Sequence, residues 1–142
     1  MTVDVLYAYA EQKKIDVDWV MLGNAECLSA PLFDGSCVIA IDPTKLLSKA
    51  DEKTKLAHEI GHCERLAFYN QYAAYDVRKK HENQADKWAI KKLIPKGELD
   101  RAVNRGLETL WDLAEYFGVT EDFMKKAVCY YTNGNLATDL YF

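Results

Sequence analysis

The sequence contains no run of about 18 apolar residues, the length that a membrane-spanning helix needs. Its first segment, MTVDVLYAYAEQKK, is acidic where a secretory signal is basic, and it lacks a small-residue cleavage site. Linkers rich in Pro, Gly or Ser, internal repeats and low-complexity tracts are also absent. We therefore expect one cytoplasmic domain over residues 1–142, without membrane association.

Paired cysteine motifs are missing as well. The four cysteines are scattered, and no two of them form a CxxC pair: Cys27, Cys37, Cys63 and Cys129. This spacing excludes a zinc knuckle and a thioredoxin-like motif. Because a disulfide framework is uncommon in a cytosolic chain of this length, we expect all four to behave as small buried apolar residues.

An excess of positive charge is also lacking. The 18 basic and 22 acidic residues give a formal net charge of -4, which argues against direct nucleic-acid binding. Hydrophobic residues make up 49% of the 142 residues, which is enough for a buried core. Histidine is scarce, and the only three histidines lie close together in the sequence: His58, His62 and His81.

The residue pattern predicts an α+β fold that is mostly helical. Residues 3–14 carry apolar side chains at helical spacing. Residues 16–42 contain segments rich in Val, Ile and Trp between Gly-Asn and Asp-Gly turns, which predicts a small antiparallel sheet near the N-terminus. Its last strand should cover about 37–42 and end before Pro43.

Helices are expected over most of the remaining chain. Ser48 and Asp51 are spaced as a capping box, which should open a helix that runs to about Tyr69. A second long helix should cover about 79–94 and stop near Pro95. With the sheet, these helices should form the first part of the domain, over about 1–96. Shorter helices should form the C-terminal part, about 97–142, with breaks at Gly106 and Gly118 and a cap at Thr120.

The segment TKLAHEIGHCERL, residues 54–66, has the spacing His-Glu-x-x-His. On a helix His58 and His62 lie about 40° apart around the axis and one turn apart along it, so both imidazoles can reach one ion. Glu59 is then placed to act as a general base on a metal-bound water. Gly61 costs about 1 kcal/mol relative to alanine inside a helix, which close approach of another backbone or of a substrate would explain. The alternative is a chance match on an amphipathic helix.

The next helix, HENQADKWAIKKLIP, supplies a third ligand. One stripe of this helix is apolar except for two carboxylates at its start: Glu82, Ala85, Asp86, Ala89, Ile90 and Leu93. Buried carboxylates need partners, and a cation held by the preceding helix would be one. We predict that Glu82 binds the metal and that Asp86 accepts a hydrogen bond from a ligand histidine. The alternative is ion pairing on a solvated face, with Lys79, Lys87 or Lys92.

The predicted ligand set has the composition of a catalytic zinc site. Two imidazoles and one carboxylate leave a fourth position for water, whereas structural sites are closed. We expect one Zn²⁺, although manganese, iron or cobalt also suit such ligands. His81 adjoins Glu82 but lies about 100° from it around the helix, so we expect it at the surface or in a supporting position.

The sequence from about Val38 to Pro95 resembles the ImmA/IrrE family of metallo-endopeptidases, a gluzincin-like group. The resemblance rests on KLAHEIGH and on seven residues of the following helix: Glu82, Ala85, Asp86, Trp88, Ala89, Leu93 and Pro95. Gln84 stands where the family often has a second acidic residue, and Trp88 replaces the usual phenylalanine. The later segment LWDLAEYFGVTEDFMKKAV is similar to the family's tail, with less specific letters.

The resemblance implies a cytosolic zinc peptidase of a kind often encoded on phages and other mobile elements. Several members act on helix-turn-helix repressors, which implies a repressor as the protein substrate and a role in transcription regulation. In the expected mechanism the zinc ion polarises the scissile carbonyl and Glu59 activates its bound water. The strand CVIAID should offer an edge to an extended substrate. The donor for the oxyanion stays open among five tyrosines: Tyr69, Tyr72, Tyr75, Tyr130 and Tyr131.

Two other functions compete with peptide hydrolysis. The C-terminal LAEYFGVTEDFMKKAV has the outline of a helix-turn-helix, which would make the chain a DNA-binding regulator. Its second helix would open with Glu121 and Asp122 against phosphates, which favours two packed helices that complete the core. The third function is a metal-binding interaction module without hydrolysis, for example a toxin-antitoxin partner.

Overall fold

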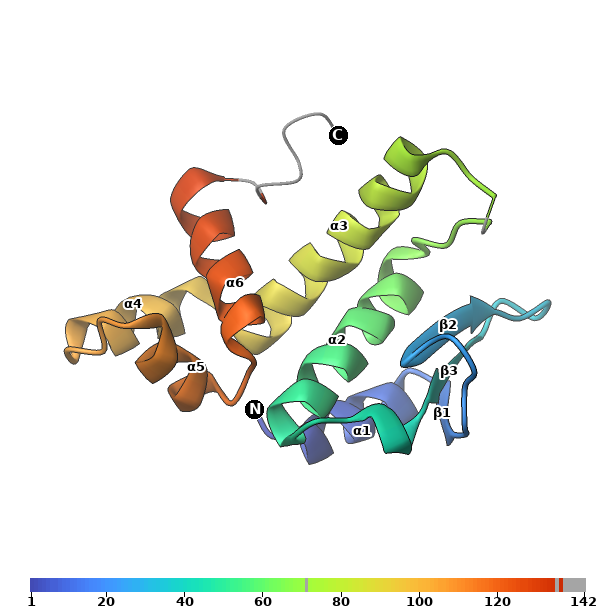
Figure 1. The fold of residues 1–142 in the computed structure, drawn as a ribbon, viewed down its shortest axis with the longest axis horizontal. Coiled ribbons are helices and arrows are strands. Elements are labelled where there is room, and N and C mark those ends of the chain that lie inside the picture. The colour runs from blue at the N-terminus through green and yellow to red at the C-terminus, as the bar shows by residue number, and fades with distance from the viewer. Residues whose placement is uncertain (71, 135, 137–142) are drawn as a thin grey trace.

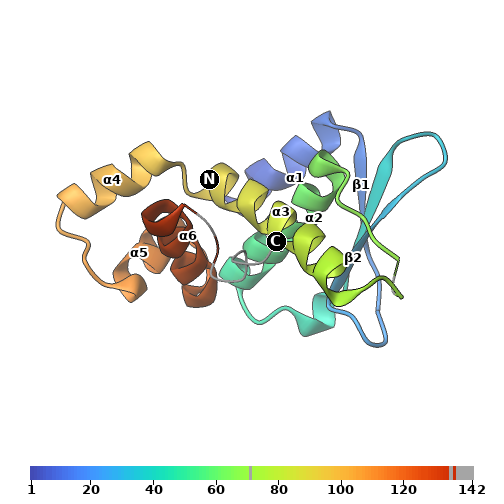
Figure 2. The same cartoon turned by 90° about the horizontal axis from the view of Figure 1, so that it is seen from above.

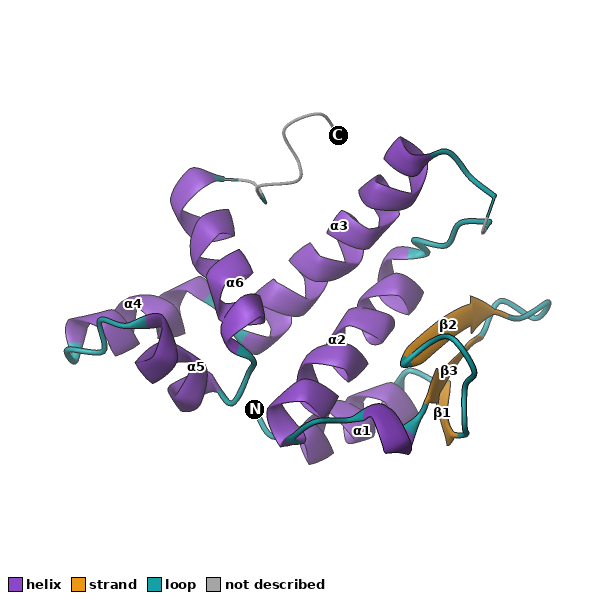
Figure 3. Cartoon of the chain, in the orientation of Figure 1, coloured by secondary structure: helices purple, strands orange, loops and turns teal. Residues whose placement is uncertain are grey.

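The computed structural model describes residues 1–70, 72–134 and 136, and it has the predicted α+β fold, mostly helical with one small sheet (Figures 1 and 3). None of the helices in this part of the chain is long and apolar enough to cross a membrane. The elements follow in this order: α1 Val3–Gln12, β1 Ile15–Trp19, β2 Cys27–Pro31, β3 Cys37–Ile41, a 3-10 turn Pro43–Lys45, α2 Lys49–Arg65, α3 Tyr75–Leu93, α4 Lys96–Asn104, α5 Leu110–Phe117 and α6 Glu121–Asn133.

The sheet is mixed, with the strand order β1-β3-β2, so the expectation of a wholly antiparallel sheet is wrong for β1. β2 and β3 form the expected antiparallel hairpin, and its turn holds Gly35 at a φ of +87°. β1 is parallel to β3. The reason is that residues 20–26 cross the end of β3, so that β1 and β2 run in opposite directions on its two sides.

The central position of β3 also corrects the expected substrate edge. Because β3 is hydrogen-bonded to a strand on each side, the segment CVIAID has no free edge. Its residues Cys37, Ile39 and Ile41 are buried in the core. β2 lies at one edge of the sheet, and it is close to α2 (Figure 1).

Helices α2 and α3 lie side by side and carry the predicted motifs (Figure 1). The Ser48 hydroxyl accepts a hydrogen bond from the Asp51 N–H at 3.0 Å, which confirms the predicted cap. α2 ends at Arg65, earlier than expected, because Leu66 takes a left-handed conformation with a φ of +51°. α3 begins at Tyr75, four residues before the expected start.

Gly61 is the point of closest approach between α2 and α3. A Cβ atom at this position would lie 2.6 Å from the carbonyl oxygen of Ala85, which is closer than real side-chain contacts. The structure therefore explains why a helix-weakening glycine stands inside the HEIGH segment: the backbone of α3 occupies the space of a side chain.

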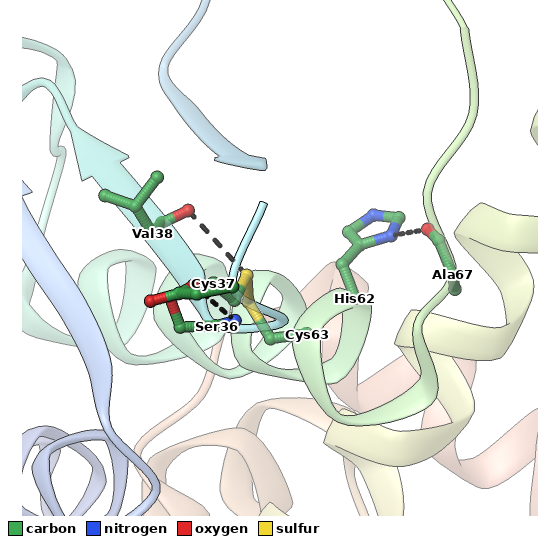
Figure 4. Close-up of a disulfide and its surroundings, with 7 residues drawn as sticks. Ser36, Cys37, Val38, His62, Cys63 and Ala67 are labelled. Carbon is green, nitrogen blue, oxygen red and sulfur yellow. Dashed lines mark hydrogen bonds between the residues drawn. A yellow bond between two sulfur atoms is a disulfide. The ribbon is translucent and has the colours of Figure 1, made fainter. Parts of the chain in front are cut away.

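A disulfide between Cys37 and Cys63 joins β3 to the last turn of α2 (Figure 4). This overturns the expectation that all four cysteines are unpaired. The strand and the helix lie far apart in the sequence, and only their packing brings the two buried sulfur atoms together. Cys27 and Cys129 are half-buried and are not disulfide-bonded.

Helices α4, α5 and α6 lie on one side of the α2–α3 pair, and the sheet lies on the other (Figures 1 and 2). Gly106 and Gly118 have positive φ at the predicted breaks, and the Thr120 hydroxyl accepts from the Phe123 N–H as the predicted cap. The Lys53 ammonium of α2 donates to the Phe117 carbonyl at the end of α5, and burial lowers the pKa of this lysine. These helices share one core with α2 and β3.

Replacement of Gly61 by alanine should destabilise the fold. The new methyl group meets the Ala85 backbone, so we expect the free energy of unfolding to fall by about 1–3 kcal/mol, the usual cost of overpacking. Urea denaturation measures this change. Gly97→Ala on α4 is the control, because a Cβ there meets only the end of the Arg101 side chain, at 3.5 Å. Equal stability of the two variants would contradict this packing.

Candidate metal centre

Three side chains from α2 and α3 form a compact cluster of metal-ligand type. One ligand atom from each of His58, His62 and Glu82 lies within 4.8 Å of the other two. The two histidine Nε2 atoms are 3.1 Å apart, and the Glu82 carboxylate lies 2.7 Å from the first and 3.2 Å from the second. Ligand atoms about 2.0–2.2 Å from one tetrahedral zinc lie a little over 3 Å from each other, so these residues fit such an ion.

The outer nitrogen of each histidine is held by a hydrogen bond. The Nδ1 atom of His58 is 2.7 Å from a carboxylate oxygen of Asp86, as predicted for that carboxylate. The Nδ1 atom of His62 is 2.6 Å from the Ala67 carbonyl oxygen (Figure 4). Because a carbonyl only accepts, Nδ1 of His62 carries the proton. Both contacts turn the Nε2 atoms toward Glu82 and leave a lone pair for a metal.

The charges of the cluster favour a cation. Burial lowers the pKa of His58, but hydrogen bonds to Asp86 and Glu82 outweigh this effect and raise the pKa to about 10. Burial raises the pKa of Glu82, while its contacts with His58 and His62 hold this pKa far below its usual range. In the metal-free protein a protonated His58 therefore lies between two carboxylates, and a divalent ion can replace its positive charge.

Glu59 is buried beside the cluster, with 6% of its surface exposed. One of its carboxylate oxygens accepts a hydrogen bond from the Cys27 thiol, with 3.7 Å between S and O. Burial, followed by the nearby Glu59, raises the pKa of this thiol, so it stays protonated and donates. The other oxygen, Oε2, has no hydrogen-bond partner among the described residues, which is costly for a buried carboxylate.

An open cleft brings Glu59 and the cluster together. It has a volume of about 690 Å³ and is lined by residues 25–31 of the β2 region, by residues 67–69 and by the histidines, Glu59 and Glu82. The cleft therefore borders both the cluster and the Glu59 side chain.

Tyr69 is the one of the five candidate tyrosines that lines this cleft. Its hydroxyl donates to Glu82 at 2.6 Å, and its pKa is raised to about 12 by burial and then by this carboxylate. Tyr72 and Tyr75 are exposed, and Tyr131 donates to the Ile94 carbonyl. The sequence could not single out Tyr69, because no local residue pattern distinguishes it from the other tyrosines. Its place in the cleft depends on how the chain runs between α2 and α3.

The partners of Glu82 and Asp86 in the structure differ from the lysines that the sequence offered as alternative ion-pair partners. Asp86 forms its ion pair with Lys126 of α6, at 3.1 Å, and Glu82 contacts the two histidines and Tyr69. Sequence reasoning missed Lys126, because 40 residues separate it from Asp86. His81 is not part of the three-residue cluster, and its ring stacks on Tyr69 with the centroids 6.1 Å apart.

Comparison with known protein families gives a match over most of the chain. The family model Peptidase_M78, described as the IrrE N-terminal-like domain, matches residues 23–128. This range includes β2, β3, the whole of α2 to α5 and most of α6, and it contains every residue of the cluster. No curated protein matches the chain at a significant level.

Zinc binding near pH 7 should release about one proton from His58, because a metal-bound nitrogen cannot keep the proton that a pKa of about 10 retains. Glu82 is already ionised and contributes none. Calorimetric titration in buffers of different ionisation enthalpy counts the protons. The release from His58 should shrink as the pH approaches 10, and binding without any release near pH 7 would contradict a protonated His58.

Proposed function

The chain belongs to the Peptidase_M78 family of IrrE N-terminal-like metallopeptidase domains, and we propose that it is a zinc-dependent endopeptidase that cleaves a helix-turn-helix repressor. The observation that carries the enzymatic part is the pairing of a metal-ligand cluster with a buried, unpartnered Glu59 oxygen in one cleft. A protein substrate follows from the peptidase family, and the repressor is the proposal that the resemblance supports.

His58, His62 and Glu82 would hold the zinc ion. When bound, zinc supplies Lewis acidity, which polarises a carbonyl and lowers the pKa of a bound water toward about 7. The hydrogen bonds of His58 to Asp86 and of His62 to Ala67 keep both rings oriented before the metal arrives. The site is therefore largely preorganised by this chain's own residues.

Glu59 is the general base in this proposal. Its side chain lines the cleft, and its buried Oε2 atom has no hydrogen-bond partner among the described residues, which leaves this oxygen able to accept a proton. The Cys27 thiol holds the other oxygen and limits rotation of the carboxylate. The same group then returns the proton to the leaving amine of the cleaved peptide.

Tyr69 is the donor that we propose for the developing oxyanion. Its hydroxyl lies at the cluster, 2.6 Å from a Glu82 oxygen, and its raised pKa keeps it protonated. In this proposal the single hydroxyl proton turns from Glu82 to the developing negative charge, which it stabilises by a hydrogen bond.

Within the described part of the chain no strand pairs with the outer edge of β2, and this free edge is the proposed binding site for an extended substrate. Two hydrogen bonds lie just beyond the two ends of the β2–β3 ladder. The Asp42 N–H donates to the Glu26 carbonyl at one end, and the Leu32 N–H donates to the Ser36 carbonyl at the other. Hydrogen-bonded pairs alternate with non-hydrogen-bonded pairs along an antiparallel ladder. The backbone N–H and C=O groups of the even-numbered residues of β2 therefore point to β3, and those of the odd-numbered residues point away from the sheet.

The outward residues of β2 are therefore Cys27, Ser29 and Pro31. The first two offer both backbone groups to an added strand, while Pro31 lacks an N–H and costs the ladder nothing at this position. Since all three line the cleft, an added strand would pass in front of Glu59.

Replacement of Glu59 by glutamine should abolish cleavage and leave zinc bound. The amide keeps the shape of the side chain but cannot accept the proton, so we expect a loss of about 10²–10⁴-fold in kcat. The assay mixes purified protein with repressors encoded by neighbouring genes and identifies fragments by mass spectrometry.

A chelator and the variant His58→Ala are the controls, and both should remove zinc and activity together. Cleavage by Glu59→Gln at the wild-type rate would exclude this mechanism. Bound zinc without cleavage of any tested protein or peptide would favour the metal-binding module, and a shift of operator DNA would favour the regulator.

The substitution Ser29→Pro should lower kcat/KM about fivefold, because it removes one outward N–H that is worth roughly 1 kcal/mol to a bound strand. Proline is tolerated on the free side of an edge strand, so the fold and zinc content should persist. Ser29→Ala keeps the N–H and is the matched control. Equal kcat/KM for the proline and alanine variants would show that substrate does not pair with β2.

A further inference from the structure

A chain of charged groups leads from the C-terminal helix α6 to the metal cluster. The Lys126 ammonium lies 3.1 Å from Oδ2 of Asp86, and Oδ1 of Asp86 lies 2.7 Å from Nδ1 of His58. The other nitrogen of His58 faces the cluster. We propose that Lys126 is a positioning residue of the metal centre that acts through Asp86; this inference rests on the zinc site of the proposed function.

Asp86 needs a cation next to its second carboxylate oxygen. The residue is 8% exposed, and a buried carboxylate without a charged partner is strongly disfavoured. Its first oxygen contacts Nδ1 of His58 at 2.7 Å, and the Lys126 ammonium, 3.1 Å from the second oxygen, supplies the positive charge next to the carboxylate.

Two fixed oxygens also define the direction of the carboxylate. With Oδ2 held by Lys126, Oδ1 points along the Nδ1–H bond of His58, and the opposite nitrogen points to Glu82 and His62. Loss of the lysine would let the carboxylate turn toward solvent and would take the histidine ring out of line. Outer hydrogen-bond partners of this kind contribute to metal affinity through such orientation.

The position of Lys126 is set by the packing of α6. Phe123, Met124 and Ala127 on the same helix are buried in the common core. The Tyr131 hydroxyl donates to the Ile94 carbonyl just beyond α3, at 2.6 Å, and so ties α6 to the helix that carries Asp86. The ammonium is therefore held beside Asp86 by an anchored helix and not by a mobile segment.

The contribution of this ion pair should appear in metal binding and not in folding. The Lys126 side chain is 54% exposed, and exposed ion pairs add little to stability because solvent screens them. Its effect on His58, in contrast, is transmitted through a carboxylate that is shielded from solvent. A variant of Lys126 should therefore keep its fold while it binds zinc less tightly.

Lys125 provides a matched control. It precedes Lys126 on α6, has the same charge and lines a different surface hollow, together with Leu110, Leu113 and Val128. If only the overall positive charge of α6 mattered, loss of either lysine would weaken zinc binding equally. The proposed contact with Asp86 is specific to Lys126.

The experiment measures the zinc Kd of the full chain by competition with a chromophoric chelator. Lys126→Met keeps the length of the side chain without its charge and should weaken zinc binding about 3–10-fold, less than the 10–100-fold of a direct partner of a ligand. Lys126→Arg should restore the Kd to within about twofold, and Lys125→Met should leave it unchanged. An unchanged Kd in Lys126→Met would overturn the inference.

A double-mutant cycle tests whether Lys126 acts through Asp86. In the Asp86→Asn background the carboxylate is gone, so Lys126→Met should have no further effect on the Kd. An undiminished effect in that background would also overturn the inference, since it would show that the lysine acts by another route. Failure of the wild-type chain to bind zinc would overturn the proposed function itself, which is a different result from normal zinc binding that ignores Lys126.

Discussion

The close packing of α2 against α3 is the constraint on which the rest of the site depends. At Gly61 the two backbones approach so closely that no side chain fits between them. This contact sets the distance at which His58 and His62 on one helix meet Glu82 and Asp86 on the other. The ligand geometry is thus a result of helix packing, and the glycine belongs to the metal site although it binds nothing.

Electrostatics then explains why the packed helices favour a cation between them. Two carboxylates on the buried face of α3 would be costly alone, and in the metal-free protein they are balanced by a protonated His58 and by Lys126. In the proposed function a divalent ion would take the place of the histidine proton. The arrangement that balances the charges of the metal-free fold would then also hold the metal.

The sheet and the C-terminal helices complete the site from opposite sides. β2 forms one wall of the cleft and gives Glu59 a thiol partner in Cys27. Helix α6 approaches from the other side and contacts Asp86 through Lys126. The C-terminal part of the chain is thus joined to the metal centre as well as to the core, which gives its packed helices a role that DNA binding does not require.

The sequence by itself determined the main helices, the cap at Ser48 and the residues of the cluster. These features are local. The period of 3.6 residues per turn places His58 and His62 on one face of a helix, and it places Glu82 on the mostly apolar stripe of the next helix. A carboxylate on an otherwise apolar stripe needs a partner, which is why the sequence could predict that Asp86 accepts a hydrogen bond from a histidine.

Only the tertiary structure decided which distant residues meet. The parallel pairing of β1, the free edge on β2, the disulfide between Cys37 and Cys63 and the contacts of Tyr69 and Lys126 all join segments whose spacing carries no signal. Such contacts depend on how elements pack in three dimensions, and a periodic pattern describes one element at a time. The sequence could therefore name the residues of the cluster, while the fold alone could show what orients them.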